Sequence, residues 1–196
     1  MNQKKNLFIL ILVFVFLIGG ASVLYSRLGE SMAPDQLAVQ EPIVDTQDEV
    51  AEEPTGPKRM MAPDFTVYDR EGNEVNLSDY HGKPIVLNFW ASWCGPCQME
   101  MPDFHEKHQQ LGADITFLMV NMTDGSRETV EGASEFVAEK GYAFPVFFDT
   151  GMDAAATYGV NSLPTTYFID ADGYAIAQAM GAIDEEALQR GIDLIT

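Results

Sequence analysis

Cysteine is almost absent from this chain. Of its 196 residues only two are cysteines, Cys94 and Cys97. Two cysteines are too few for the disulfide framework of a small secreted protein, and a bridge across three positions closes too short a loop to stabilise a fold much. The pair is therefore expected to serve reactivity, and a redox dithiol is the chemistry that a Cys-X-X-Cys spacing favours.

Basic residues are also scarce. The chain has 11 lysines and arginines against 30 aspartates and glutamates, a formal net charge of −19. A surface this acidic repels phosphate backbones, and nucleic acid is therefore not an expected partner. Simple solubility is one interpretation of the acidity, and steering of basic partner proteins is another.

Sequence signals for a metal or a covalent cofactor are weak. There are three histidines, and His105 and His108 do not have a zinc-finger spacing relative to the cysteines. Gln98 rather than histidine follows Cys97, which excludes the haem-attachment signature. The sequence therefore predicts no metal and no cofactor other than the redox-active Cys94 and Cys97 pair.

The N-terminal region has the length and composition of a membrane span. Two lysines precede a window of 19 residues without a charge, residues 7–25, which nearly matches a hydrocarbon core of about 30 Å. We therefore expect residues 1–26 to be a single-pass anchor with a cytoplasmic N-terminus and an extracytoplasmic C-terminal domain, by the positive-inside tendency. A cleaved signal peptide ending near the small residues Gly19 and Ala21 is the alternative, and it also exports the domain.

The remaining chain divides by composition at about residue 60. Residues 27–60 are acidic and proline-containing with almost no aromatic residues, which predicts a flexible linker. Residues 61–196 alternate apolar runs with helical patterns and turn residues, which predicts one mixed sheet covered by helices on both faces. The expected strands are 65–68, 74–77, 84–89, 115–120, 144–148, 165–169 and 174–180, and the expected helices are 98–111, 129–140, 153–158 and 184–195.

The two cysteines lie in Trp93 to Cys97, between a buried strand and a helix. A helix N-terminus presents unpaired N–H groups and a partial positive charge, both of which favour a thiolate. Cys94 at the helix start is the predicted attacking sulfur, and Cys97, one turn further, is the predicted resolving thiol. Gly95 leaves the approach to Cys94 open, and Pro96 stiffens the turn.

Trp93 to Cys97, followed much later by Leu163-Pro164-Thr165, resembles the thioredoxin fold. The opening Ala62-Pro63-Asp64-Phe65, together with Glu100 after the cysteines, is similar to the TlpA/ResA group of membrane-anchored thiol-disulfide oxidoreductases. The resemblance covers residues 61–196. It implies an α/β thioredoxin-like fold with an added N-terminal β-hairpin and a central strand and helix insertion at about residues 129–148.

The same resemblance implies roles for the residues around the cysteines. Pro164 would be a cis-proline facing the dithiol, and the predicted substrate-binding residues are Trp93, Gly95, Pro96, Leu163, Pro164 and Thr165. Thioredoxins have a buried aspartate where this chain has Asn88, so that proton acceptor is missing here. Glu100 matches the glutamate that ResA-type proteins are thought to use, and it is the predicted partner for the proton of Cys97. A solvated surface glutamate is the alternative for Glu100.

The resemblance also implies an activity and partners. A Gly-Pro pair between the cysteines is shared with reducing thioredoxins, which favours reduction of disulfides in exported proteins. Apo-cytochrome c is the leading implied substrate, and a transmembrane thiol carrier is the implied electron donor. Two other functions stay open: a thiol peroxidase, suggested by the Ala-Pro-Asp-Phe opening, and a redox-gated binding or sensor protein.

Overall fold

The structure, a computed structural model, describes residues 38–39 and 60–196. The predicted anchor, residues 1–26, and most of the predicted linker lie outside these described residues. In residues 38–39 and 60–196, no helix has the length and apolar character needed to cross a membrane.

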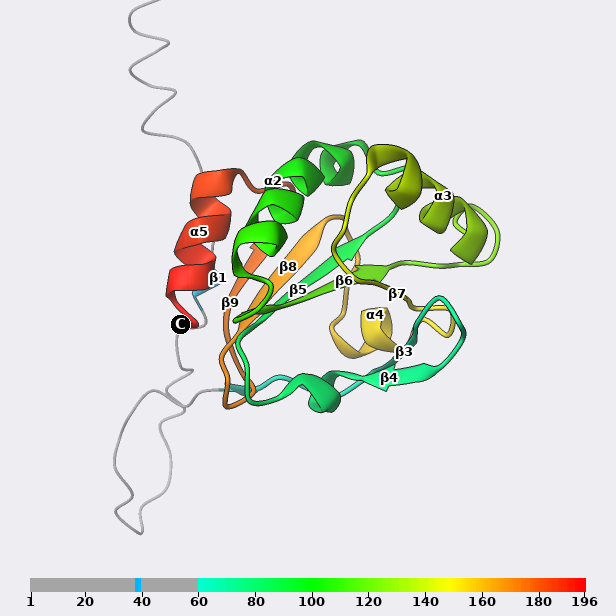
Figure 1. Ribbon diagram of the computed structural model, residues 1–196. Coiled ribbons are helices and arrows are strands. Elements are labelled where there is room, and N and C mark those ends of the chain that lie inside the picture. Colours follow the sequence, from blue (N-terminus) through cyan, green and yellow to red (C-terminus); the bar gives the residue numbers. More distant parts are fainter. Residues whose placement is uncertain (1–37, 40–59) are drawn as a thin grey trace, which may run out of the picture. The chain divides into compact units, whose positions relative to one another are not determined.

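The described strands form a single mixed sheet (Figure 1). Its order is β1-β9-β8-β5-β6-β7-β3-β4, and β2 also pairs with β9. The pairs β5–β6 and β6–β7 are parallel, whereas the other pairs are antiparallel. The strands are β1 (Ala38–Val39), β2 (Met60–Met61), β3 (Thr66–Tyr68), β4 (Glu74–Asn76), β5 (Ile85–Trp90), β6 (Thr116–Asn121), β7 (Val146–Phe148), β8 (Thr165–Ile169) and β9 (Tyr174–Met180).

The central strand β5 leads directly to the cysteines. All six of its residues are buried, as expected for a strand that is covered on both faces. Its side chains alternate between the two faces, so Val86 and Trp90 join one apolar cluster and Leu87 and Phe89 join the other. Asn88 is therefore on the same face as Val86 and Trp90, and this is the face that α2 covers.

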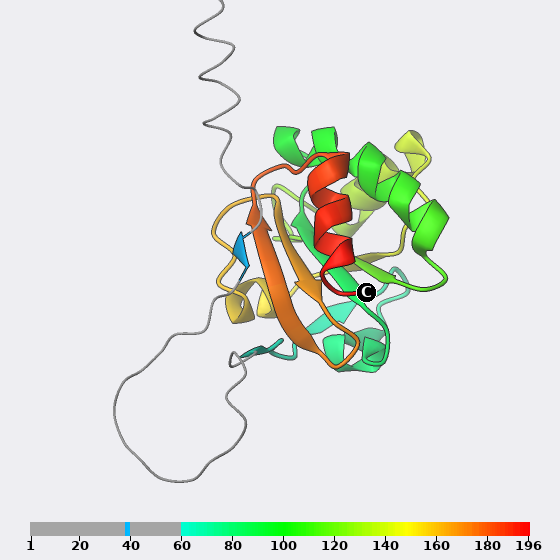
Figure 2. The same ribbon diagram turned by 90° about the vertical axis from the view of Figure 1, so that its left-hand side faces the viewer.

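The described residues contain four α-helices, which cover the sheet: α2 (Gly95–Leu111), α3 (Val130–Lys140), α4 (Asp153–Thr157) and α5 (Glu185–Asp193). Residues of α2 and α5 pack in the first cluster, whereas Ala154 of α4 packs in the second. Figures 1 and 2 show α2 and α5 side by side on one face of the sheet. Thr129 and Asp184 cap the N-termini of α3 and α5, and Gly141 ends α3 in the left-handed conformation.

The predicted N-terminal hairpin is confirmed. Strands β3 and β4 pair antiparallel, and the short 3-10 helix η1 (Leu77–Tyr80) follows them. The sequence did not predict that Ala38 and Val39, inside the predicted linker, and Met60 pair with β9. These short segments cover the outer edge of β9, whose backbone groups need partners.

Candidate active site

Cys94 and Cys97 form a disulfide at the start of α2. Their Cα atoms are 5.2 Å apart, and Cys94 is the N-cap residue of the helix. The Cys94 Sγ accepts a hydrogen bond of 3.2 Å from the Cys97 N–H, one of the donors that a helix N-terminus leaves free. The sulfur that was predicted to attack is therefore the one at the capping position.

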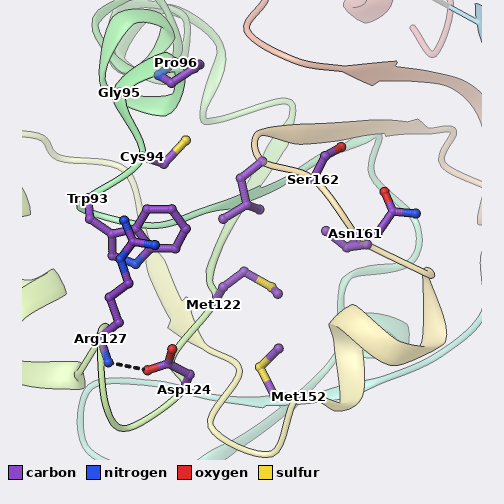
Figure 3. A pocket seen from close by; sticks show the side chains of 12 residues that line it. Trp93, Cys94, Gly95, Pro96, Met122, Asp124, Arg127, Met152, Asn161 and Ser162 are labelled. Atoms are coloured by element: carbon purple, nitrogen blue, oxygen red, sulfur yellow. Dashed lines mark hydrogen bonds between the residues drawn. The ribbon is translucent and has the colours of Figure 1, made fainter.

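The two sulfurs differ in their access to solvent. Cys97 is completely buried, and Cys94 is 5% exposed, which is less than the sequence predicted for a nucleophile. A cavity of about 540 Å³ opens beside Cys94 but is not lined by Cys97. Figure 3 shows its walls, which are formed by residues 93–96, Met122, Asp124, Arg127, Met152 and residues 160–163. A reacting partner thus reaches Cys94 through this cavity.

Trp93, one of the predicted substrate-binding residues, lines the cavity at the surface. The Trp93 side chain is 41% exposed, whereas Trp90 is completely buried in the core. The guanidinium carbon of Arg127 lies 3.5 Å from the centre of the Trp93 ring, within the range of a cation–π contact. Figure 3 shows Arg127 against Trp93, with its backbone N–H donating to Asp124.

Glu100 lies on α2 three residues after Cys97 and does not line the cavity. It is 2% exposed, which overturns the alternative of a solvated surface glutamate. Its Oε1 accepts a hydrogen bond of 2.8 Å from Asn88 Nδ2, and its Oε2 accepts one of 3.0 Å from the Ile183 N–H. Burial raises the pKa of Glu100 to about 8, and these two hydrogen bonds offset only part of that rise.

This arrangement can exchange a proton near neutral pH. Glu100 follows Cys97 by three residues on α2, so the two side chains share one face of the helix. A carboxyl group with a pKa of about 8 is mostly protonated at pH 7 and can give up its proton without a large cost. The geometry therefore supplies a buried proton donor and acceptor on the side of Cys97.

Asn88 connects the proton site to the neighbouring strand. Its Nδ2 donates to Glu100 Oε1 and to Thr166 Oγ1, the latter at 3.0 Å. Asn88 therefore does not replace the aspartate of thioredoxins as an acid or base, since an amide does not titrate. It holds the carboxylate of Glu100 in place.

The Leu163–Pro164 peptide bond is cis, as the resemblance implied. Leu163 lines the cavity beside Cys94, but Pro164 and Thr165 are buried and are not among its lining residues. The Pro164 carbonyl accepts from the Gly181 N–H, and Thr165 Oγ1 donates to the Ser162 carbonyl. Among the predicted substrate-binding residues, Trp93, Gly95, Pro96 and Leu163 therefore meet at one cavity.

Sequence reasoning missed the opposite wall of the cavity. Met122, Asp124 and Arg127 belong to the loop after β6, which the sequence predicted only as a loop, and Met152 precedes α4. Met152 has a left-handed backbone, with φ of 57°, which L-residues other than glycine seldom adopt. No sequence signal marked these residues, because the topology of the sheet brings them together.

Histidine, cysteine and acidic side chains do not gather into a metal-ligating group of three or more in the part of the chain that the structure describes. His105 Nδ1 accepts a hydrogen bond from the Ala143 N–H, and the ring of His108 packs against Phe117.

A cysteine pair at the start of a helix that packs on a mixed sheet, beside a cis-proline loop, defines a thioredoxin-like thiol-disulfide oxidoreductase. The chain belongs to the AhpC/TSA family, whose sequence model matches residues 59–178, and to the ResA-type thiol-disulfide oxidoreductases. This assignment confirms the predicted family, fold and class of enzyme.

Similar proteins match about two thirds or more of this chain. Thiol-disulfide oxidoreductase ResA of Bacillus anthracis is 39% identical over 138 residues, which are 69% of this chain and 76% of that protein. The crystal structure of a DsbF homologue from Corynebacterium diphtheriae has a TM-score of 0.62 and 28% identity, and the match covers 73% of this chain and 96% of that one. The exposed lipoprotein thioredoxin Etrx1 of Streptococcus pneumoniae has a TM-score of 0.56 and 35% identity, with coverage of 67% and 100%.

Proposed function

We propose that this oxidoreductase works as a reductant of disulfides in exported polypeptides, with Cys94 as the attacking sulfur. The observation that carries the proposal is the asymmetry of the disulfide: the cavity is lined by Cys94 and not by Cys97, and the buried carboxyl group of Glu100 follows Cys97 by three residues on α2. The Gly95-Pro96 pair between the cysteines, shared with reducing thioredoxins, supports the direction of the reaction.

The reaction has two exchange steps. The Cys94 thiolate attacks a disulfide of the substrate, forms a mixed disulfide and releases one substrate sulfur as a thiolate. Cys97 then loses its proton to the Glu100 carboxylate and attacks Cys94 Sγ. This second attack forms the Cys94–Cys97 disulfide, releases the other substrate sulfur and completes a two-electron reduction of the substrate.

The cavity residues would hold the substrate during these steps. Trp93 and Leu163 present apolar surface beside Cys94, and Gly95 and Pro96 are exposed at the helix start. Pro164 and Thr165 fix the loop that carries Leu163 through their bonds to Gly181 and Ser162. An extended polypeptide with a disulfide fits such an open, largely apolar site better than a small polar molecule does.

The cellular setting is part of the proposal. Residues 7–25 would anchor the chain in the cell membrane, and residues 27–60 would let the domain reach partners outside it. A transmembrane thiol carrier would return electrons to the Cys94–Cys97 disulfide, and apo-cytochrome c would be a substrate. The acidic charge of the chain is consistent with attraction of a basic polypeptide.

A trapping experiment tests the proposal. In Cys97→Ser the second attack cannot occur, so the mixed disulfide on Cys94 accumulates and mass spectrometry identifies the substrate. We expect exported cysteine-containing proteins, including apo-cytochrome c, to be trapped in cells that carry this variant. Cys94→Ser is the matched control and should trap none of them.

Three results would contradict the proposal. Failure of Cys97→Ser to trap any exported protein would remove the proposed substrates. A Cys94–Cys97 reduction potential well above that of its substrates' disulfides would make the protein an oxidant. Rapid consumption of peroxide by the purified full-length protein would instead support a thiol peroxidase.

A further inference from the structure

A second buried glutamate, Glu128, lies under the loop that leads to Cys94. Glu128 is 2% exposed. Its Oε1 accepts hydrogen bonds from the Ser92 N–H at 2.8 Å and from Asn121 Nδ2 at 2.7 Å. Its Oε2 accepts from the Ser92 hydroxyl at 2.8 Å. One carboxylate thus joins the end of strand β6 to the segment directly before Trp93 and Cys94.

Ser92 is held from two sides. Its N–H and hydroxyl donate to Glu128, and its carbonyl oxygen accepts a bond of 2.6 Å from Gln98 Nε2 on helix α2. The Cys94 N–H donates to the Ala91 carbonyl, which closes the turn. The backbone on which Cys94 sits is therefore fixed both to β6 and to its own helix.

The same loop also places Arg127 against Trp93. Asp124 Oδ1 accepts from the N–H groups of Ser126, Arg127 and Glu128 at 2.8, 2.8 and 3.0 Å. This folds the loop so that Glu128 points inward to Ser92 while Arg127, the next residue toward the N-terminus, stacks on Trp93. Two adjacent residues therefore hold the two residues that precede Cys94.

We propose that Glu128 is a positioning residue of this enzyme. It holds the Ser92-Trp93-Cys94 segment in the conformation in which a protein disulfide can dock against Trp93 and Cys94. The carboxylate uses three donors, all of which would lose their partner if it were removed. The part of the proposal that concerns a protein disulfide as substrate rests on the proposed function. The part that concerns the placement of Trp93 does not, because that placement can be measured separately.

The chain offers a conservative variant that separates position from charge. In Glu128→Gln the amide oxygen can still accept from the Ser92 N–H and Asn121 Nδ2. The amide nitrogen can donate to the Ser92 hydroxyl, which also accepts hydrogen bonds. Glu128→Gln therefore keeps all three contacts without the charge, whereas Glu128→Ala removes them all.

The experiment compares both variants in the full-length protein with two readouts. The first is acrylamide quenching of tryptophan fluorescence, which reports Trp93 because the only other tryptophan, Trp90, is completely buried. The second is kcat/KM for reduction of a protein disulfide, set against the rate of Cys94 alkylation by iodoacetamide in the reduced protein. For Glu128→Ala we expect stronger quenching of Trp93 and a kcat/KM lowered about tenfold. A tenfold loss is the rate change expected when the transition state loses the stabilisation of about one buried hydrogen bond. Alkylation should change less than about twofold, since a small reagent needs no docking.

Val67→Ala is the control for loss of stability alone. Val67 is buried in the other apolar cluster, on the face away from α2. The Val67→Ala substitution should lower the unfolding temperature without changing the quenching of Trp93 or kcat/KM. Should Glu128→Ala fail to fold, Ser92→Ala removes only the hydroxyl contact and should change both readouts in the same direction to a smaller extent.

The outcomes distinguish the inference from the proposed function. The positioning role is supported if Glu128→Gln keeps near wild-type Trp93 quenching and kcat/KM while Glu128→Ala does not. Equal loss in both Glu128 variants, or changes matched by Val67→Ala, would overturn it. If the wild-type protein reduces no protein disulfide, the proposed function fails. Trp93 quenching that stays unchanged in Glu128→Ala would then overturn the positioning role independently.

Discussion

The two sulfurs of the disulfide face different surroundings, although they lie one helical turn apart. Cys94 adjoins an open cavity with an exposed tryptophan, an arginine and several apolar side chains at its walls. Cys97 is completely enclosed, and the buried carboxyl of Glu100 follows it by three residues on the same helix. We propose that this difference separates two tasks, with partner contact on the Cys94 side and proton exchange on the Cys97 side.

Two glutamates with the same exposure make the contrast sharper. Glu100 and Glu128 are each 2% exposed. Glu128 accepts from three donors, two of them on Ser92. Glu100 accepts from two, and burial raises its pKa to about 8. Equal burial thus accompanies two different sets of donors: those of Glu128 connect it to Ser92 and Asn121, and those of Glu100 offset only part of the rise in its pKa.

The largest effect should come from the cysteines themselves. Cys94→Ser should abolish disulfide reduction, because no cysteine thiol then lies at the cavity. Cys97→Ser should allow a single round of attack and then stop at the mixed disulfide. Stopped-flow kinetics with a protein disulfide, followed by nonreducing electrophoresis, measures both. If Cys97→Ser formed no mixed disulfide while Cys94→Ser did, the assignment of the two sides would be reversed.

The buried carboxyl on the Cys97 side should make stability depend on pH. The pKa of Glu100 is raised from 4.5 to about 8 in the fold, so the folded state favours the protonated group. Its stabilising contribution is complete below pH 4.5 and is lost as the pH rises toward 8. Between these values the oxidised wild-type protein should lose ~1.4 kcal/mol of unfolding free energy per pH unit relative to Glu100→Gln.

Urea unfolding of the two proteins at several pH values from 5 to 8 measures this difference. Other titrating groups act alike in both proteins, so their effects cancel in the comparison. Glu128→Gln, the same substitution at the buried glutamate on the Cys94 side, is the matched control variant. Parallel stability curves for wild type and Glu100→Gln would show that Glu100 is not the buried acid described here.

A finer test concerns the hydrogen bond between Asn88 and Glu100. Asn88→Ala removes the donor to Glu100 Oε1, which stabilises the ionised carboxylate. The pKa of Glu100 should therefore rise, and the pH midpoint of mixed-disulfide resolution should move upward by about one unit. Thr166→Val, which removes only the other partner of Asn88 Nδ2, should leave the midpoint where it is. A midpoint unchanged in Asn88→Ala would separate Asn88 from the proton site.

The smallest expected effect is at the rim of the cavity. Arg127→Ala removes the guanidinium that stacks on Trp93, a contact of ~0.5–1 kcal/mol at an exposed site. The kcat/KM for a protein disulfide should fall by about two- to fivefold, which corresponds to that energy. Arg127→Lys keeps the charge but not the planar stack, so its kcat/KM should lie between those of the wild type and Arg127→Ala. Equal rates in all three proteins would show that the rim does not contribute to docking.

The positions of Cys97 and Glu100 on one helix could be predicted from the sequence, and their roles stay predictions. Cys94, Cys97 and Glu100 lie on one stretch of helix, where spacing along the chain determines which side chains share a face. Most strands and helices were also predicted within a few residues, because their apolar patterns match the burial of a sheet covered on both faces.

The Cys94 side was harder to predict. Arg127 and Glu128 lie more than 30 positions after Cys94, in a loop without a distinctive composition, and the crossover from β5 through α2 to β6 brings them to the site. The pairing of Ala38 and Val39 with β9 was also missed, since two apolar residues in an acidic segment carry almost no strand signal.

The most direct test of the account is the pH dependence of mixed-disulfide resolution in wild type and Glu100→Gln. Single-turnover kinetics would follow release of a reduced protein substrate from Cys94 between pH 5 and 9. We predict that the wild-type rate rises with a midpoint near pH 8 as Glu100 becomes able to accept the Cys97 proton, and that Glu100→Gln is slower by about 10²-fold with no such midpoint. Identical pH profiles for the two proteins would contradict the central claim that proton exchange occurs at Glu100.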